Sequence, residues 1–246
     1  MTGPSANPFP YPRRLWVRRL LRWLARRVLG LVARFEVQGQ ANLPAGGPLI
    51  VVANHFSIVD VVAMVAATDW PLEFLGGLQL VDAPWYLAWI PHVWGYYPVR
   101  RGAASREAMR ASLAVLEQGG VLCIFPEAGS WAQVLRPARP GTALIAVESG
   151  APVLPIGLDG MPDVIPGMRR LRRARATVQI GRPMGPFVVP GRGRARRQAL
   201  DEIGDELMRV IAVLIPPAKR GVYSADARLR AEAAAVAEFP YHDLYG

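Results

Sequence analysis

The sequence has a single cysteine, Cys123, a single lysine, Lys219, and only three histidines. One cysteine excludes a disulfide within the chain and a metal site built from cysteines. Because Cys123 lies in the apolar run 121–125, a buried thiol with a structural role is expected. The chain has no stretch of about 20 consecutive apolar residues, which a membrane-spanning helix requires. It also has no uninterrupted apolar segment ahead of a signal-peptide cleavage site.

What the chain has in excess is arginine and apolar residues. Its 246 residues are 52% hydrophobic and carry a formal net charge of +10, with a pI near 10.7. This length favours one large domain with a sizeable core over two full domains. Such a positive surface suits anionic partners, namely phospholipid headgroups, phosphorylated substrates, acidic carrier proteins or nucleic acid.

The N-terminal region divides into a leader at 1–12, rich in proline and small residues, and a predicted helix at 13–34. Projected at about 100° per residue, the apolar side of this helix comprises Val17, Leu20, Leu21, Leu24, Val28, Leu31 and Val32, and the basic side comprises Arg18, Arg19, Arg22 and Arg26. Trp16 and Trp23 fall near the boundary. A basic amphipathic helix bordered by tryptophans is typical of a segment in the membrane interface. The alternative is a helix packed on the protein's own core with a solvated arginine face.

The remainder alternates between strand-like and helix-like segments. Strands are predicted at 35–38, 49–53, 72–75, 96–99, 121–125, 153–158 and 177–180, and helices at 58–67, 83–90, 105–118, 140–149 and 198–214, with a solvated loop at 192–197. This alternation predicts an α/β fold in which helices flank a largely parallel central sheet. We expect one such domain over 35–217, followed by a peripheral tail at 218–246.

One short segment, 54–60, combines a histidine with a carboxylate at the end of the buried strand 49–53. Histidine exchanges a proton near neutral pH, and a nearby carboxylate can fix its tautomer and stabilise the imidazolium. His55 and Asp60 therefore form the base and the orienting group of a catalytic triad, without an obvious protein nucleophile. The alternative is a helix cap in which Ser57 or Asp60 caps the following helix and His55 is a loop residue.

Three further strand ends carry residues suited to binding. Arg100 and Arg101 follow one strand, Glu127 and Gly129 follow another, and Pro155 lies in a third strand-then-loop segment. In open α/β sheets the ligand lies outside the carboxyl ends of the strands. The sequence thus predicts a base, a cationic pair, a carboxylate and a proline-shaped loop at the carboxyl ends of the strands.

These four segments, in this order, resemble the glycerophospholipid acyltransferase family, whose best-known members acylate lysophosphatidic acid. The resemblance spans residues 35–183. It implies transfer of a fatty acyl group from a thioester to the free hydroxyl of a lysophospholipid, first of all lysophosphatidic acid, giving phosphatidic acid. His55 would be the general base and Asp60 its orienting partner, and the acceptor's own hydroxyl would be the nucleophile. The absence of a G-x-S-x-G motif agrees with this, and Ser57 and Ser130 are expected to cap turns.

The resemblance also implies six residues that bind or shape the substrate: Arg101, Arg100, Glu127, Gly129, Asn54 and Pro155. Arg101 would be the primary contact to the acceptor phosphate, since a guanidinium offers paired donors. Glu127 would accept a hydrogen bond from a substrate hydroxyl or tether an arginine, and both options stay open. The sequence departs from the family's usual third motif at Ala128, where a glycine commonly follows the glutamate.

No cofactor is expected beyond the acyl donor, a coenzyme A or acyl-carrier-protein thioester. We predict no metal, because His92 and His242 lack a second ligand at metal spacing, and no nucleic-acid partner, because no RRM, KH or zinc-finger pattern is present. The expected location is peripheral, on the cytoplasmic face of the cell membrane, against an anionic surface. Two alternatives remain: an acyltransferase for another lysophospholipid, glycerol 3-phosphate, an aminolipid or a glycolipid, and an inactive peripheral membrane-binding protein.

Overall fold

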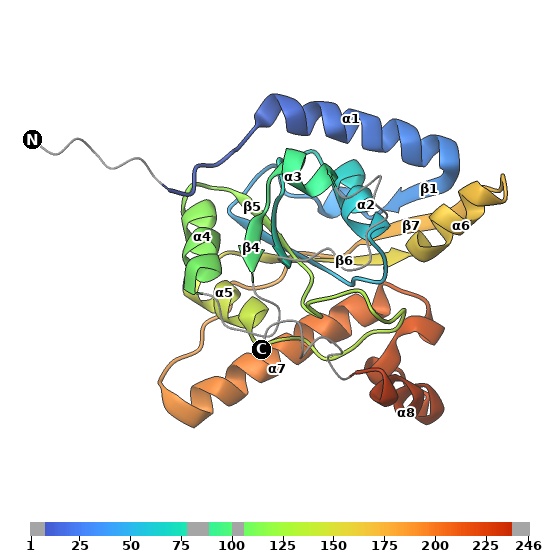
Figure 1. The fold of residues 1–246 in the computed structure, drawn as a ribbon. Coiled ribbons are helices and arrows are strands. Elements are labelled where there is room, and N and C mark those ends of the chain that lie inside the picture. The colour runs from blue at the N-terminus through green and yellow to red at the C-terminus, as the bar shows by residue number, and fades with distance from the viewer. Residues whose placement is uncertain (1–7, 78–88, 100–105, 238–246) are drawn as a thin grey trace, which may run out of the picture.

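The computed structural model describes residues 8–77, 89–99 and 106–237. This part of the chain forms an α/β domain around a seven-stranded sheet with the strand order β1-β7-β6-β2-β5-β3-β4 (Figure 1). The strands are β1 Ala33–Gln38, β2 Leu49–Ala53, β3 Glu73–Gly77, β4 Tyr97–Val99, β5 Val121–Ile124, β6 Val153–Asp159 and β7 Ala174–Ile180. The helices are α1 Leu15–Val32, α2 Val59–Ala67, α3 Ile90–Trp94, α4 Arg106–Glu117, α5 Gly141–Ser149, α6 Val164–Arg169, α7 Gly193–Val213 and α8 Ala227–Ala235. The predicted fold class is confirmed.

The sheet is largely parallel, as predicted, but one edge runs the other way. β6, β2, β5, β3 and β4 are parallel to one another, whereas β7 pairs with β6 antiparallel and β1 pairs with β7 parallel. β6 reaches β7 through the short 3-10 turn Met161–Asp163 and α6. The chain turns back after this link, so β7 runs antiparallel to β6.

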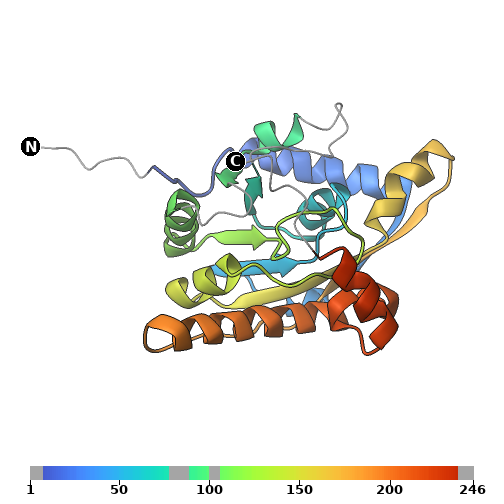
Figure 2. The same cartoon turned by 60° about the horizontal axis from the view of Figure 1, so that its bottom comes forward.

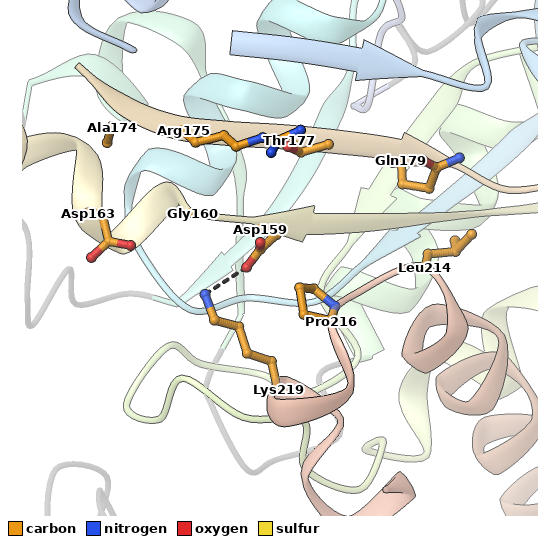
Figure 3. Close-up of a pocket in the computed structure, with 10 residues that line it drawn as sticks. All are labelled: Asp159, Gly160, Asp163, Ala174, Arg175, Thr177, Gln179, Leu214, Pro216 and Lys219. Carbon is orange, nitrogen blue, oxygen red and sulfur yellow. Dashed lines mark hydrogen bonds and ion pairs between the residues drawn. The ribbon is translucent and has the colours of Figure 1, made fainter. Parts of the chain in front are cut away.

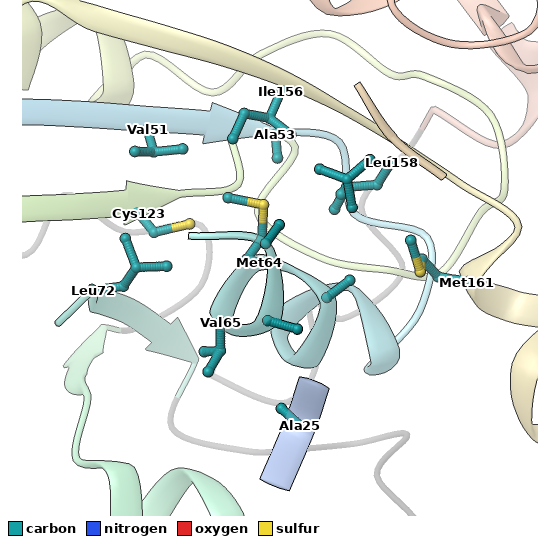
Figure 4. Close-up of a cluster of buried hydrophobic side chains, with 14 of the residues drawn as sticks. Ala25, Val51, Ala53, Met64, Val65, Leu72, Cys123, Ile156, Leu158 and Met161 are labelled. Atoms are coloured by element: carbon teal, nitrogen blue, oxygen red, sulfur yellow. The ribbon is translucent and has the colours of Figure 1, made fainter. Parts of the chain in front are cut away.

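Each face of the sheet carries its own hydrophobic core. β2 is buried along its whole length, as expected for a parallel strand covered on both faces. Its alternate residues Val51 and Ala53 pack with α1 and α2 in one cluster (Figure 4). Ile50 and Val52 pack with α5 and α7 in the other. The described part of the chain therefore has three layers: α1 and α2, the sheet, and α5 and α7 (Figure 2). Packing on both faces of the sheet fixes the position of β2.

Most predicted elements match the observed ones within a few residues. The predicted loop at 192–197 is wrong, because α7 already begins at Gly193. Arginine is a good helix former, so the arginine-rich run extends the helix towards its N-terminus. The helix predicted at 83–90 lies almost wholly outside the described residues, and α3 begins where that prediction ends.

Helix α1 is present as predicted, and part of its arginine side, including Arg18, contacts the protein. Arg18 is only 2% exposed and contacts both carboxylate oxygens of Glu73, at 2.7 and 2.9 Å. The guanidinium groups of Arg22 and Arg26 contact Asp69 at the domain surface. The alternative of a helix packed on the core with a solvated arginine face is met in part: Ala25 and Leu29 join the core, whereas Arg18 is buried instead of solvated.

The opposite side of α1 exposes large apolar residues: Trp16, Leu20, Trp23, Leu24, Val28 and Leu31. Only a minority of its apolar side chains, among them Ala25 and Leu29, join the core. Across the described ranges, no helix combines the length and the hydrophobicity of a membrane span.

Candidate active site

The loop after β2 brings the predicted histidine and carboxylate into contact. Nδ1 of His55 lies 3.0 Å from Oδ2 of Asp60. Asp60 is buried and His55 is partly exposed. With Nδ1 facing the carboxylate, Nε2 is the ring nitrogen left to meet a substrate. This is the arrangement of a general base and its orienting group.

Backbone hydrogen bonds fix the carboxylate. Oδ2 of Asp60 also accepts the N–H groups of Phe56 at 2.6 Å and Ser57 at 2.7 Å. The Ser57 hydroxyl accepts the N–H of Val59 at 3.2 Å, which is the turn-capping contact expected of it. The capping and catalytic interpretations are thus compatible, because one carboxylate both closes the turn and holds the imidazole.

A stacked aromatic ring fixes the imidazole from one side. The rings of His55 and Phe125 lie 4.2 Å apart between centroids at an interplanar angle of 19°. Phe125 directly follows β5, the neighbour of β2 in the sheet. Because both strands are parallel, their carboxyl ends bring the two rings together. Phe125 was not among the predicted site residues, although its place directly before Pro126-Glu127 was a usable signal.

Glu127 links the two loops through buried hydrogen bonds. Its Oε1 accepts the backbone N–H of His55 at 2.9 Å. Its Oε2 accepts the backbone N–H of Arg136 at 3.1 Å and the guanidinium Nε–H at 3.0 Å. Burial raises the pKa of the Glu127 carboxyl, and the charge of Arg136 and the donated N–H groups lower it. Of the two options left open, Glu127 here tethers an arginine.

Arg136 is a buried residue that the sequence motifs did not indicate. Its guanidinium carbon lies 3.7 Å from the centroid of the Trp131 ring, and it also donates to the carbonyl of Gly129. A methyl group added at Gly129 would meet the Trp131 ring at 2.4 Å. A larger residue at this position would therefore displace the Trp131 ring from its place over Arg136.

Ala128 has a φ of 62°, in the left-handed region that favours glycine. The family's usual glycine at this place thus has a conformational reason. An alanine adopts this conformation at a cost of about 1 kcal/mol. Its N–H closes a turn onto the carbonyl of Phe125 at 3.0 Å.

Asn54 and Pro155 occupy buried positions in the sheet rather than the surface of the loop. The Asn54 amide donates to the carbonyl of Leu158 at 2.9 Å and accepts its N–H at 2.7 Å. This pair continues the ladder between β2 and β6 past the last residue of β2. Pro155 lies within β6 opposite Val52. Both residues hold strands at the base of the site.

The predicted site residues are therefore brought together in part. His55, Asp60 and Glu127 form one connected network, and Gly129 joins it through Arg136. Arg100 and Arg101 lie outside the described residues. In the described segments no group of three or more histidine, cysteine or acidic side chains is placed to hold a metal ion.

A separate hollow of about 630 Å³ lies between the β6–β7 edge and the segment after α7 (Figure 3). Across it, the amine of Lys219 donates to a carboxylate oxygen of Asp159 at 2.6 Å. Neither His55 nor Asp60 lines this hollow. Lys219 and Asp159 already neutralise each other. We therefore do not assign the hollow to the acyl-transfer chemistry.

Comparison with known proteins identifies the family of the chain. The sequence profile of the acyltransferase family matches residues 34–159, just over half of the 246-residue chain. The chain therefore belongs to the acyltransferase family. The matched segment contains His55, Asp60 and Glu127, and it spans β1 to β6.

Two relatives are more specific in name. The chain is 26% identical over 135 residues to "1-acyl-sn-glycerol-3-phosphate acyltransferase BAT2, chloroplastic" of Brassica napus. That match covers 53% of this chain but only 39% of the plant protein. The crystal structure of the 1-acyl-sn-glycerophosphate (LPA) acyltransferase PlsC from Thermotoga maritima superposes with a TM-score of 0.56 at 23% identity. It covers 78% of this chain and 79% of PlsC, a likeness that establishes the fold.

Proposed function

We propose that this acyltransferase moves a fatty acyl group from an acyl thioester to the free hydroxyl of lysophosphatidic acid, which gives phosphatidic acid. The observation that carries the proposal is the oriented base: Nδ1 of His55 on Asp60, at the carboxyl end of a central parallel strand. The names of the two relatives, both acyltransferases of this acceptor, support the choice of substrate.

In this mechanism Nε2 of His55 takes the proton from the acceptor hydroxyl as its oxygen attacks the thioester carbonyl carbon. Asp60 stabilises the imidazolium that forms. The carbon–sulfur bond then breaks, and the imidazolium returns the proton to the departing thiolate of coenzyme A or an acyl carrier protein. The hydroxyl of the substrate replaces the serine of a hydrolase, so no covalent enzyme intermediate is needed.

The roles of the binding residues divide into contact and support. By resemblance, Arg101, with Arg100 beside it, binds the acceptor phosphate. Glu127 supports the base, since its Oε1 holds the His55 backbone. Asn54 and Pro155 support the site from below through β6.

Membrane association follows from the exposed side of α1. Trp16 and Trp23 lie outward with the guanidinium groups of Arg19 and Arg27 over their rings, at 5.4 and 5.8 Å. Apolar residues flanked by tryptophan and arginine are the composition of a helix in the bilayer interface. The helix would lie on the anionic cytoplasmic face of the cell membrane, where the acceptor lipid resides.

The decisive experiment is mass spectrometry of lipid products made by the purified protein in mixed micelles. Both thioester donors and a panel of acceptors would be supplied: lysophosphatidic acid, another lysophospholipid, glycerol 3-phosphate, an aminolipid and a glycolipid. We expect phosphatidic acid, and a loss of at least ~10²-fold in His55→Ala, the scale of general-base catalysis. Ser57→Ala is the matched control in the same loop and should retain most activity.

Each result has a definite reading. A product from a different acceptor would correct the substrate and keep the chemistry. Product formation that is equal in His55→Ala and the native protein would refute the mechanism. No product from any acceptor, with vesicle binding intact, would leave a membrane-binding protein on an acyltransferase fold.

A further inference from the structure

The turn between α6 and β7 is the most exposed apolar and basic feature outside α1. Residues 168–173 read Met-Arg-Arg-Leu-Arg-Arg, and all six are exposed. Leu171 has 96% of its surface in solvent. Single exposed leucines are common on protein surfaces, so the local backbone and the surroundings decide whether this one has a role.

The backbone holds Leu171 outward in a conformation that leucine does not favour. Its φ is 54°, in the left-handed region usually taken by glycine or asparagine. The turn is closed by hydrogen bonds from the N–H of Leu171 to Met168 at 3.0 Å and from the N–H of Arg172 to Gly167 at 2.9 Å. Neither packing nor backbone preference favours a leucine here. A residue that breaks local rules without a gain in stability points to a function outside the fold.

The same turn is joined to the C-terminal end of α1. The guanidinium of Arg173 donates to the carbonyls of Gly30 at 2.6 Å and Ala33 at 2.7 Å. Figures 1 and 2 both place α6 and this turn beside that end of α1. Leu31, an exposed residue in the last turn of α1, is therefore close in the chain to the carbonyls that Arg173 binds. The turn and the C-terminal end of α1 are therefore neighbours in the fold.

The charge of the turn is not neutralised. In the described part of the chain, the guanidinium groups of Arg169, Arg170 and Arg172 make no hydrogen bond or ion pair, and no acidic residue occurs between 164 and 176. Arginines around a projecting leucine suit a lipid surface, where guanidinium groups reach the phosphates and the apolar side chain enters the acyl region. A purely polyanionic partner would gain nothing from Leu171.

We propose that the turn 168–173 is a second membrane-contact element that binds an anionic phospholipid surface together with the outward side of α1. Two contacts restrict the tilt of the domain on the bilayer, whereas a single helix would leave the domain free to rotate about the axis of that helix. The inference rests on the membrane association proposed above for the acyltransferase. Its test, however, measures lipid contact without using turnover.

The single native cysteine makes a direct test possible. Cys123 is fully buried, and burial raises the pKa of its thiol, so Leu171→Cys introduces the one accessible thiol in the full chain. A polarity-sensitive fluorophore on this thiol should shift to the blue with phosphatidylglycerol vesicles and be quenched by brominated lipid. Leu31→Cys on α1 is the positive control. Val188→Cys, 83% exposed, is the matched apolar control and should not respond.

Charge gives a second, independent readout. Arg170→Gln with Arg172→Gln should weaken binding to phosphatidylglycerol vesicles roughly 30-fold, at about 1 kcal/mol for each arginine near an anionic surface. Arg194→Gln with Arg197→Gln, two exposed arginines of α7, removes the same charge elsewhere. That control should change binding by much less.

Three results would overturn the proposal. The first is a response from Leu31→Cys without one from Leu171→Cys, which would leave α1 as the contact. The second is no response from either site. The third is a response of Leu171→Cys to acyl carrier protein without lipid, which would assign the turn to an acidic protein. Failure of the acyl-transfer proposal would appear separately, as absent product with these lipid responses intact.

Discussion

Helices α1 and α7 are both long and rich in arginine, yet they bury opposite sides. α7, of 21 residues, buries Ile203, Leu207, Met208 and Ile211 against the sheet. α1, of 18 residues, buries Arg18 together with Ala25 and Leu29 and presents Trp16, Leu20 and Leu31 to the outside. α7 follows the usual rule for a surface helix, whereas α1 departs from it by burying an arginine and exposing large apolar side chains.

The difference arises from what lies beneath each helix. The sheet face under α7 is apolar, so apolar side chains are the ones that gain from burial. Beneath α1 lies the buried carboxylate of Glu73 at the start of β3. The carbonyl of Trp94 accepts the Nε–H of Arg18 at 3.2 Å. A buried charge is tolerated only when it is paired and hydrogen-bonded, and this pocket meets both conditions for Arg18.

The largest effect should come from removing the carboxylate that orients α1. Glu73→Gln keeps the shape of the side chain but leaves the buried Arg18 charge uncompensated. We expect a loss of about 3–5 kcal/mol in the free energy of unfolding, the cost of breaking a buried pair on one side. Urea denaturation of the native and variant proteins measures it.

The control for this change is Glu148→Gln, which removes an exposed partner of Arg196. Exposed pairs contribute about 0–1 kcal/mol, so this variant should unfold close to the native protein. Equal stability of Glu73→Gln and Glu148→Gln would mean that the buried pair does not anchor α1. The difference between the buried sides of α1 and α7 would then need another explanation.

A smaller effect is expected at the outward side of α1, and it should appear in lipid binding. Leu20 is 63% exposed on α1 and Val213 is 66% exposed on α7. Leu20→Asp should weaken binding to anionic vesicles roughly 10- to 100-fold, because burying a leucine contributes about 1.5–3 kcal/mol. Val213→Asp should leave binding unchanged, and vesicle sedimentation measures both.

Because both positions are exposed, neither substitution should change the free energy of unfolding by more than about 0.5 kcal/mol. A large loss of stability in Leu20→Asp would show that this side of α1 packs on protein. Equal loss of lipid binding in both variants would show a general effect of negative charge instead. Either result would contradict the proposal that the outward side of α1 contacts lipid.

The sequence allowed the central strands and the pairing of His55 with Asp60 to be predicted because their signals are local. β2 is a continuous apolar run, and His55 and Asp60 are five residues apart in one loop. The amphipathic pattern of α1 was equally visible. The side that α1 buries could not be read from the sequence, because it depends on Glu73, which lies 55 residues beyond Arg18.

The parts of the site that were missed depend on contacts across the fold. Phe125 meets His55 only because β5 lies beside β2. Arg136 belongs to no pattern, and its role follows from a buried carboxylate in the same loop, Glu127. The reversed direction of β7 is likewise a matter of its pairing with β6 across the fold, which the composition of the strand did not indicate.

The smallest effect should come from the exposed ion pairs that also hold α1. Asp69 is exposed and lies 2.9 Å from Arg26 and 3.5 Å from Arg22. Asp69→Asn should lower the free energy of unfolding by at most about 1 kcal/mol, and added salt should abolish the difference. Urea denaturation at low and high salt measures this. The carbonyls of Ala66 and Asp69 would still accept bonds from Arg26 and Arg22. A loss as large as that of Glu73→Gln would place the anchor at the surface, whereas a small, salt-sensitive loss places it in the buried pair beneath the helix.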